Sequence, residues 1–219
     1  PSRKVTNTIT PPAGEGGARS VALHTVVISS DGEHLFGGGT LGLVRAPVRG
    51  KDAAKVIFDP NGGIRHVWLV DGAQKIALIP GTEADLVFTD LEALWEVKRV
   101  PIFPGKTFGN VSAAAASPDG KFIAVTSSEM KAADGGGATS TEPCKLTVFD
   151  TDRQERLTWQ FADYADFSYA QVVFPDVRTL ALCLPSGQMH RWRLDANEQW
   201  KEDPQAVRID PGRYTAIAA

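Results

Sequence analysis

The sequence predicts an all-β fold made of repeated units, each an antiparallel sheet of four short strands. Three observations lead to this prediction. A turn of the Ser-Pro-Asp-Gly type recurs between apolar runs, and three of the four copies are followed by a second apolar run that ends in Asp. The turn aspartates are separated by 40, 48 and 57 residues. Each unit has room for about four strands, and a period of roughly 40–50 residues with four strands is typical of a β-propeller blade.

The turn is clearest in the stretch AAAASPDGKFIAV, residues 113–125. Asp119-Gly120 between two apolar runs is a strong hairpin signal, because glycine adopts a positive φ without steric cost. The same pattern occurs at three other places, around Asp31, Asp71 and Asp176. The last copy has Val177 where the others have glycine. We expect the four aspartates to be structural residues of tight turns.

The second apolar run of a unit ends in an aspartate at Asp90, Asp150 and Asp195. The distance from the turn aspartate to this run end is 19 residues in the second and fourth units and 31 in the third. A carboxylate at the end of a strand accepts hydrogen bonds from the backbone N–H groups of the following turn. We therefore expect these aspartates to be structural as well.

The third unit carries 12 additional residues, which we place within residues 131–143. This segment has no apolar periodicity and contains three consecutive glycines, so we expect an exposed and poorly ordered loop. Repeat geometry does not require the loop, which makes it a candidate partner-binding site. The candidate contact residues are Met130, Lys131, Asp134 and Glu142. A surface insertion without function stays an alternative, because a longer loop costs little closure entropy.

The pattern predicts a single β-propeller over residues 1–219. We place its blades at 21–60, 64–104, 111–163 and 167–209, with partial blade strands at 3–10 and 213–219. A propeller closes into a ring, because open sheet edges pair with other chains. The chain is then either a piece of a ring of roughly seven blades or a small closed ring whose termini complete one blade. We favour the piece, whose open blade edges would pair with the rest of a propeller or with another copy.

The stretch SPDGKFIAV, followed by KLTVFDTD, resembles WD-repeat and bacterial lactonase-like propellers over residues 21–209. The sequence departs from the WD pattern, since no unit has a Gly-His dipeptide and the terminal Trp-Asp is replaced by Thr-Asp, Phe-Asp or Leu-Asp. The resemblance implies a non-catalytic scaffold that presents loops to a protein partner. The alternatives are a propeller enzyme of lactonase or quinoprotein type with an axial site, and an extracytoplasmic sensor domain.

Composition narrows the classes of partner. The net charge is −3 and no block of like charge occurs, which argues against nucleic acid. No apolar run approaches the ~20 residues of a membrane helix, so we expect no membrane insertion. The two cysteines, Cys144 and Cys183, are expected to be buried thiols. The chain starts at Pro1, which leaves a processed start or a removed signal peptide open, with a slight preference for the cytoplasm.

No motif predicts catalytic, cofactor or metal residues, and we expect none. Residues 37–42 match the dinucleotide pattern G-x-G-x-x-G, but an alternating run broken by Pro47 follows instead of a helix, which indicates a turn between two strands. No G-x-S-x-G elbow occurs. The histidines do not have metal-ligand spacing, and they are His24, His34, His66 and His190. The tryptophans are expected to pack between blades, and they are Trp68, Trp95, Trp159, Trp192 and Trp200.

Overall fold

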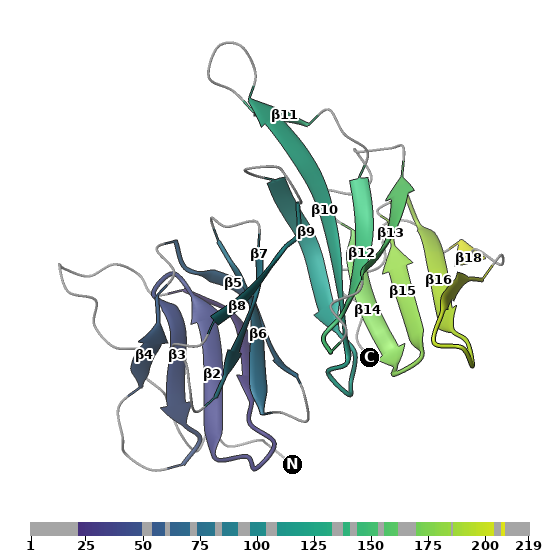
Figure 1. Cartoon of the computed structure of the whole chain (residues 1–219). Coiled ribbons are helices and arrows are strands. Elements are labelled where there is room, and N and C mark those ends of the chain that lie inside the picture. Colours follow the sequence, from purple (N-terminus) through teal and green to yellow (C-terminus); the bar gives the residue numbers. More distant parts are fainter. Residues whose placement is uncertain are drawn as a thin grey trace, which may run out of the picture. The chain divides into compact units, whose positions relative to one another are not determined.

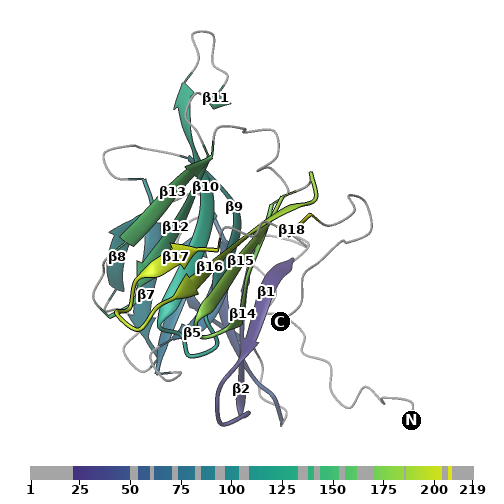
Figure 2. The same ribbon diagram turned by 90° about the vertical axis from the view of Figure 1, so that its right-hand side faces the viewer.

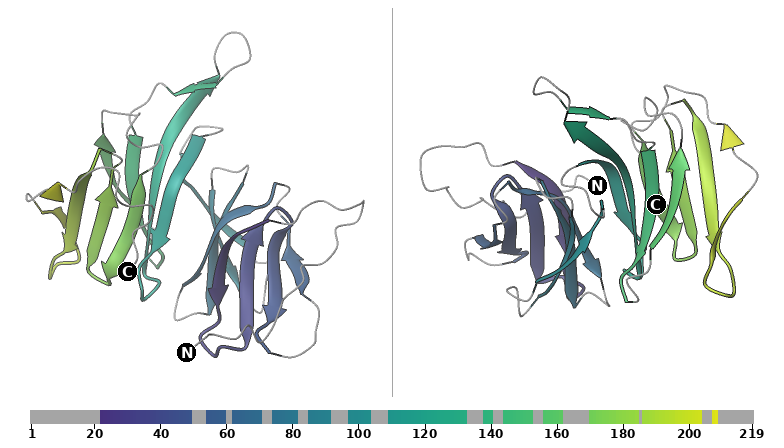
Figure 3. Two further views of the ribbon diagram at one scale, coloured as in Figure 1. Left: turned by 180° about the vertical axis from the view of Figure 1, so that it is seen from behind. Right: turned by 45° about the horizontal axis from the view of Figure 1, so that its top comes forward.

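The computed structural model describes residues 22–49, 54–59, 62–70, 74–81, 85–91, 97–103, 109–132, 138–140, 144–152, 156–161, 170–184, 186–203 and 207–208. Within these ranges every regular element is a β-strand, and no helix occurs (Figure 1). The chain divides into two compact units, Pro1–Pro101 and Ile102–Ala219. Figure 3 shows the strands of each unit from two further sides.

The first unit contains two antiparallel sheets of four strands. The strands of its first sheet are β1 (Leu23–Ile28), β2 (His34–Gly39), β3 (Gly42–Pro47) and β4 (Lys55–Phe58). Those of the second sheet are β5 (Ile64–Val70), β6 (Lys75–Pro80), β7 (Asp85–Asp90) and β8 (Val97–Pro101). In both sheets each strand pairs with the next strand of the chain, so each sheet is a simple meander.

The second unit contains two further sheets with the same meander. The main strands of one are β9 (Gly109–Ala116), β10 (Phe122–Ala132), β12 (Cys144–Asp150) and β13 (Arg156–Phe161). Those of the other are β14 (Gln171–Asp176), β15 (Thr179–Cys183), β16 (Gln188–Leu194) and β17 (Trp200–Glu202). Two short strands are added, β11 (Ala138–Ser140) on β10 and β18 (Val207–Arg208) on β16.

The two sheets of the first unit pack through alternate side chains of their strands. Val27, Phe36 and Leu43 belong to one hydrophobic cluster with Ile64 and Val67. Side chains alternate between the two faces of a strand, so a period of two in the sequence gives each sheet an apolar face. Gly38 lies in this contact, because a Cβ there would come within 2.7 Å of the Ile64 side chain.

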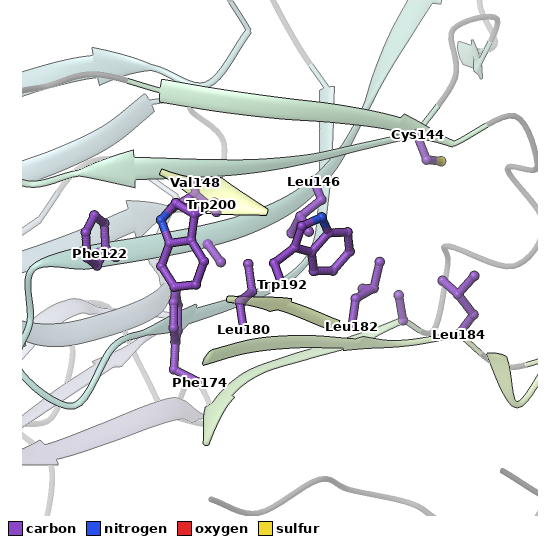
Figure 4. Close-up of a cluster of buried hydrophobic side chains, with 12 residues drawn as sticks. Phe122, Cys144, Leu146, Val148, Phe174, Leu180, Leu182, Leu184, Trp192 and Trp200 are labelled. Atoms are coloured by element: carbon purple, nitrogen blue, oxygen red, sulfur yellow. The ribbon is translucent and has the colours of Figure 1, made fainter. Parts of the chain in front are cut away.

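The two sheets of the second unit meet in a core rich in aromatic residues (Figure 4). Trp192 and Trp200 extend from the β14–β17 sheet toward Leu146 and Val148 of β12. The Trp200 ring meets the Phe122 ring edge to face at 5.3 Å. Such aromatic pairs bury a large area and add about 0.5–1.5 kcal/mol each.

These sheets confirm the predicted fold class and several details. In the third sheet, the strands that the sequence predicts at 111–117, 121–128, 144–149 and 156–161 are β9, β10, β12 and β13. The glycine-rich stretch at 37–42 forms the end of β2, the β2–β3 turn at residues 40–41 and the start of β3, where Gly42 has a φ of 96°. Cys144 and Cys183 are buried thiols, as predicted.

Other predictions have a different outcome. The single-domain extent and the ring size stay predictions, and the partial strands at 3–10 and 213–219 lie outside the described residues. The predicted loop at 131–143 is wrong in part, because β10 continues to Ala132 and β11 pairs with it. The physical reason is that the ladder satisfies the backbone N–H and C=O groups of these residues, which a solvated loop would leave to water.

Candidate functional site

The turn between β1 and β2 is held by a network around Asp31. The Asp31 carboxylate accepts hydrogen bonds from the Ser29 hydroxyl at 2.5 Å and from the Glu33 backbone N–H at 2.9 Å. The Ser29 hydroxyl in turn accepts the His34 backbone N–H at 2.8 Å. Gly32 has a φ of 73°, which glycine adopts without strain. The serine, aspartate and glycine of the motif therefore each have a role in closing the hairpin.

The turn between β9 and β10 repeats this network at Asp119. Its carboxylate accepts the Ser117 hydroxyl at 2.6 Å and the Lys121 backbone N–H at 3.1 Å. The Ser117 hydroxyl accepts the Phe122 backbone N–H at 2.9 Å. Gly120 has a φ of 71°. The sequence repeat therefore corresponds to a repeated local structure.

The other predicted turn aspartates lie at strand ends. Asp176 accepts the Arg178 backbone N–H at 2.7 Å, and Asp150 accepts the Asp152 backbone N–H at 2.9 Å. Asp90 ends β7 opposite Lys75 of β6. Asp71 lies outside the described residues.

Asp195 combines hydrogen bonds within its own turn with an ion pair. It accepts the backbone N–H groups of Asn197 at 2.8 Å and Gln199 at 3.0 Å, and it pairs with the Lys201 ammonium at 2.7 Å. The Lys201 side chain and these N–H groups lower the pKa of Asp195 to about 2. The Ser29 hydroxyl and the Glu33 N–H likewise lower the pKa of Asp31. These oxygens are already engaged by their own turns, which fits a structural role.

The predicted partner-binding residues lie in and around the β10–β11 hairpin. Here Met130, Lys131 and Ala132 of β10 pair with β11, whose strand is three residues long. The β10–β12 ladder ends at Ser127. β10 therefore continues past its main ladder, and the hairpin projects from the end of the sheet (Figures 1 and 2). Asp134 and Glu142 lie outside the described residues.

The four histidines lie on separate strands of two units. His66 stacks on Trp68 with ring centroids 5.4 Å apart. Burial, with smaller contributions from Arg65 and His24, lowers the pKa of His66 to about 4. The ring is therefore neutral at neutral pH.

His190 of β16 lies in a second aromatic setting that the sequence motifs do not reveal. Its Nδ1 atom is 2.8 Å from the Glu202 carboxylate, and Phe161 and Trp192 flank the ring at 5.2 and 5.9 Å. The signal for the His190–Glu202 pair is the β16–β17 register. This register places Glu202 opposite Trp192, which lies two residues from His190 on the same strand.

Among the described residues, no group of three or more His, Cys, Asp or Glu side chains is placed to hold a metal ion. The same part of the chain contains no helix that is long and apolar enough to cross a membrane. The candidate partner-binding site is the β10–β11 hairpin, which is described by its backbone ladder and which the repeat itself does not require.

The comparison with known proteins finds similar solved structures. No protein family and no curated protein match the sequence. The periplasmic gluconolactonase PpgL of Pseudomonas aeruginosa is similar with 18% identity over 86% of this chain and 55% of its own, with a TM-score of 0.55. The β-propeller domain of Cps50 (Swd1) from Myceliophteria thermophila has 9% identity over 85% of this chain and 60% of its own, with a TM-score of 0.58. Hsv2 of Kluyveromyces lactis has 12% identity over 84% of this chain and 61% of its own, with a TM-score of 0.55.

These similar structures share an architecture and not a single kind of function. The chain spans between 55% and 61% of their lengths. All three are β-propellers, and at these identities the likeness concerns the fold. Together with the four antiparallel meander sheets, this likeness shows that the chain has a β-propeller fold.

Proposed function

We propose that this protein is a non-catalytic interaction scaffold whose β10–β11 hairpin contacts a protein partner. The observation that carries the proposal is the projection of this hairpin from the end of the β9–β13 sheet (Figure 2). Propellers serve many unrelated functions, so the fold alone does not support one of them.

The strand pairing between β10 and β11 favours the binding of a protein partner by this hairpin. Met130–Ser140, Lys131–Thr139 and Ala132–Ala138 are cross-strand neighbours, so the backbone of this segment is already paired before any partner arrives. A preorganised element loses less conformational entropy on binding than a free loop does. The strand segment also combines an apolar residue, Met130, with a basic residue, Lys131. Methionine is enriched at protein interfaces, because its flexible apolar side chain adapts to different partners.

Quantitative affinity purification tests the proposal with matched variants of the full chain. In the test variant, residues 130–142 are replaced by a short Gly-Ser linker. The control is Leu157→Ala, which alters an exposed side chain on β13 of the same sheet. We expect one or more proteins captured by the wild type to be lost with the linker variant and kept with the control. A set of captured proteins that is identical in all three samples would contradict the proposal.

The second candidate function is lactone hydrolysis, because a similar fold occurs in the gluconolactonase described above. A hydrolase assay with gluconolactone, together with metal analysis of the purified chain, separates the two candidates. Turnover above the buffer rate that depends on a bound divalent metal would favour the enzyme. Absence of turnover, with hairpin-dependent capture of a partner, would favour the scaffold.

A further inference from the structure

The first strands of the two sheets in the first unit each contain a β-bulge. β1 and β5 contact each other, and each is an edge strand of its sheet. The register of β1 shifts directly after Leu23, which makes His24 the extra residue. The register of β5 shifts directly after Ile64, which makes Arg65 the extra residue. Both bulges therefore place a basic residue at adjoining sheet edges.

The bulge in β5 changes which side chains face the neighbouring sheet. Ile64 and Val67 are three residues apart, yet both pack against the Gly38 position of β2, where a Cβ would come within 2.7 and 2.8 Å of them. In a regular strand, residues three apart lie on opposite faces. Arg65 and His66 therefore share the place of one residue, and both lie off the packed face. Bulges re-aim side chains in this way and are common next to functional sites.

Three basic side chains gather at the two bulges. The His66 ring is partly buried and stacks on Trp68, which fixes its orientation. Arg65 and His24 lie close enough that their positive charges add to the effect of burial in lowering the pKa of His66. Both of these side chains are exposed. The cluster thus presents one permanent cation, the Arg65 guanidinium, beside two imidazole rings.

The part of the chain that the structure describes provides no acidic partner for this cluster. Arg65 forms no hydrogen bond or ion pair with any described residue. By contrast, Arg99 of β8 in the same sheet lies 3.8 Å from the Asp85 carboxylate. A bulge and one charge are enough to keep an edge strand from pairing with other chains. Edge protection therefore does not account for three basic groups that lie together without an acid.

We propose that His24, Arg65 and His66 form a binding site for an oxyanion, that is, for the phosphate or carboxylate group of a small ligand. A guanidinium donates two parallel hydrogen bonds to such a group, and each imidazole ring can donate one more. The permanent charge of Arg65 repels metal ions and attracts anions. The site uses β1 and β5 alone, so its failure would leave the proposed role of the β10–β11 hairpin untouched.

Proton NMR of the full chain tests the site, with inorganic phosphate and acetate as separate probes at constant ionic strength. The ring signals are assigned with the variants His24→Gln and His66→Gln. We expect at least one probe to shift the signals of both rings in a saturable way. It should also raise the pKa of His66, because a bound anion favours the protonated ring. Saturation by phosphate alone, by acetate alone or by both would identify the group that the site prefers.

Two matched variants show which arginine holds the anion. Arg65→Gln is expected to weaken binding by on the order of 10-fold or more, since it removes the charge-assisted hydrogen bonds. Arg99→Gln is the control, because Arg99 is an arginine of the same sheet that already faces Asp85, and it should leave the affinity unchanged.

Three results would overturn the proposal. One is the absence of a saturable shift of the wild-type ring signals with either probe. Another is an equal shift with chloride at the same ionic strength, which would show simple screening of the charges. The third is an affinity that stays the same in Arg65→Gln. The first two results come from the wild type and do not depend on the folding of a variant.

Discussion

Replacing His66 by Gln tests the most perturbed histidine of the chain. His66 lies in β5, stacked on Trp68, and burial lowers its pKa from 6.5 to about 4. The unfolded chain binds a proton near pH 6.5, whereas the folded chain binds it only near pH 4. Between these values the unfolded state holds more protons, so stability rises with pH. The contribution of His66 is therefore complete above pH 6.5 and is lost as the pH falls toward 4.

The size of this effect follows from the pKa difference. One pKa unit corresponds to about 1.4 kcal/mol, so a fall from 6.5 to about 4 is worth about 3 kcal/mol at most. His66 keeps part of its surface in contact with solvent, which reduces the expected effect to about 2 kcal/mol. Glutamine retains a polar side chain and does not titrate in this range.

The assay is urea unfolding of both proteins from about pH 7.5 to about pH 4. We expect the wild type to lose about 2 kcal/mol more than the His66→Gln variant over this range. The carboxylates and the other histidines titrate in both proteins, so their contributions cancel in the comparison. Proton NMR of the His66 ring gives its pKa directly. Parallel pH dependences of the two proteins, or a His66 ring that titrates near 6.5, would refute the assignment.

Four further substitutions test the turns and the cores through urea unfolding. Asp119→Ala removes the acceptor of two hydrogen bonds in the β9–β10 turn and should cost about 1–2 kcal/mol, and an unchanged midpoint would show that solvent replaces the carboxylate. Gly38→Ala places a Cβ 2.7 Å from the Ile64 side chain and should cost about 1–3 kcal/mol. Gly32→Ala meets no atom within 4 Å and should cost only about 1–2 kcal/mol from its positive φ, so a larger loss there than at Gly38 would contradict the packing argument. Trp192→Ala should cost about 3–5 kcal/mol, since Trp192 is fully buried in the core of the second unit, and a loss below 1 kcal/mol would mean that this core is not formed in solution.

The local structure of this protein was largely predictable. The hairpin turns at Asp31 and Asp119 follow from residue types whose conformational preferences are local, and the structure has the expected φ at Gly32 and Gly120. The period of two in the strands likewise indicates which side chains face a neighbouring sheet. The candidate hairpin was predictable only as an insertion, because residues 131–143 have no strand periodicity on either side of their Asp134-Gly135 pair.

The sequence by itself determined the repeat, the four-stranded units and the turn chemistry, since each depends on interactions between residues that are close along the chain. Only the tertiary structure decided that β10 continues into the β10–β11 hairpin, that His66 is neutral beside Trp68, and that His190 meets Glu202. It also decided that Val27 packs against the β5–β8 sheet while Val26 and Ile28 on the other face of β1 are exposed. The physical reason is that burial and strand register arise from contacts between segments far apart in sequence. The alternation of Val26, Val27 and Ile28 is the same whichever face is covered.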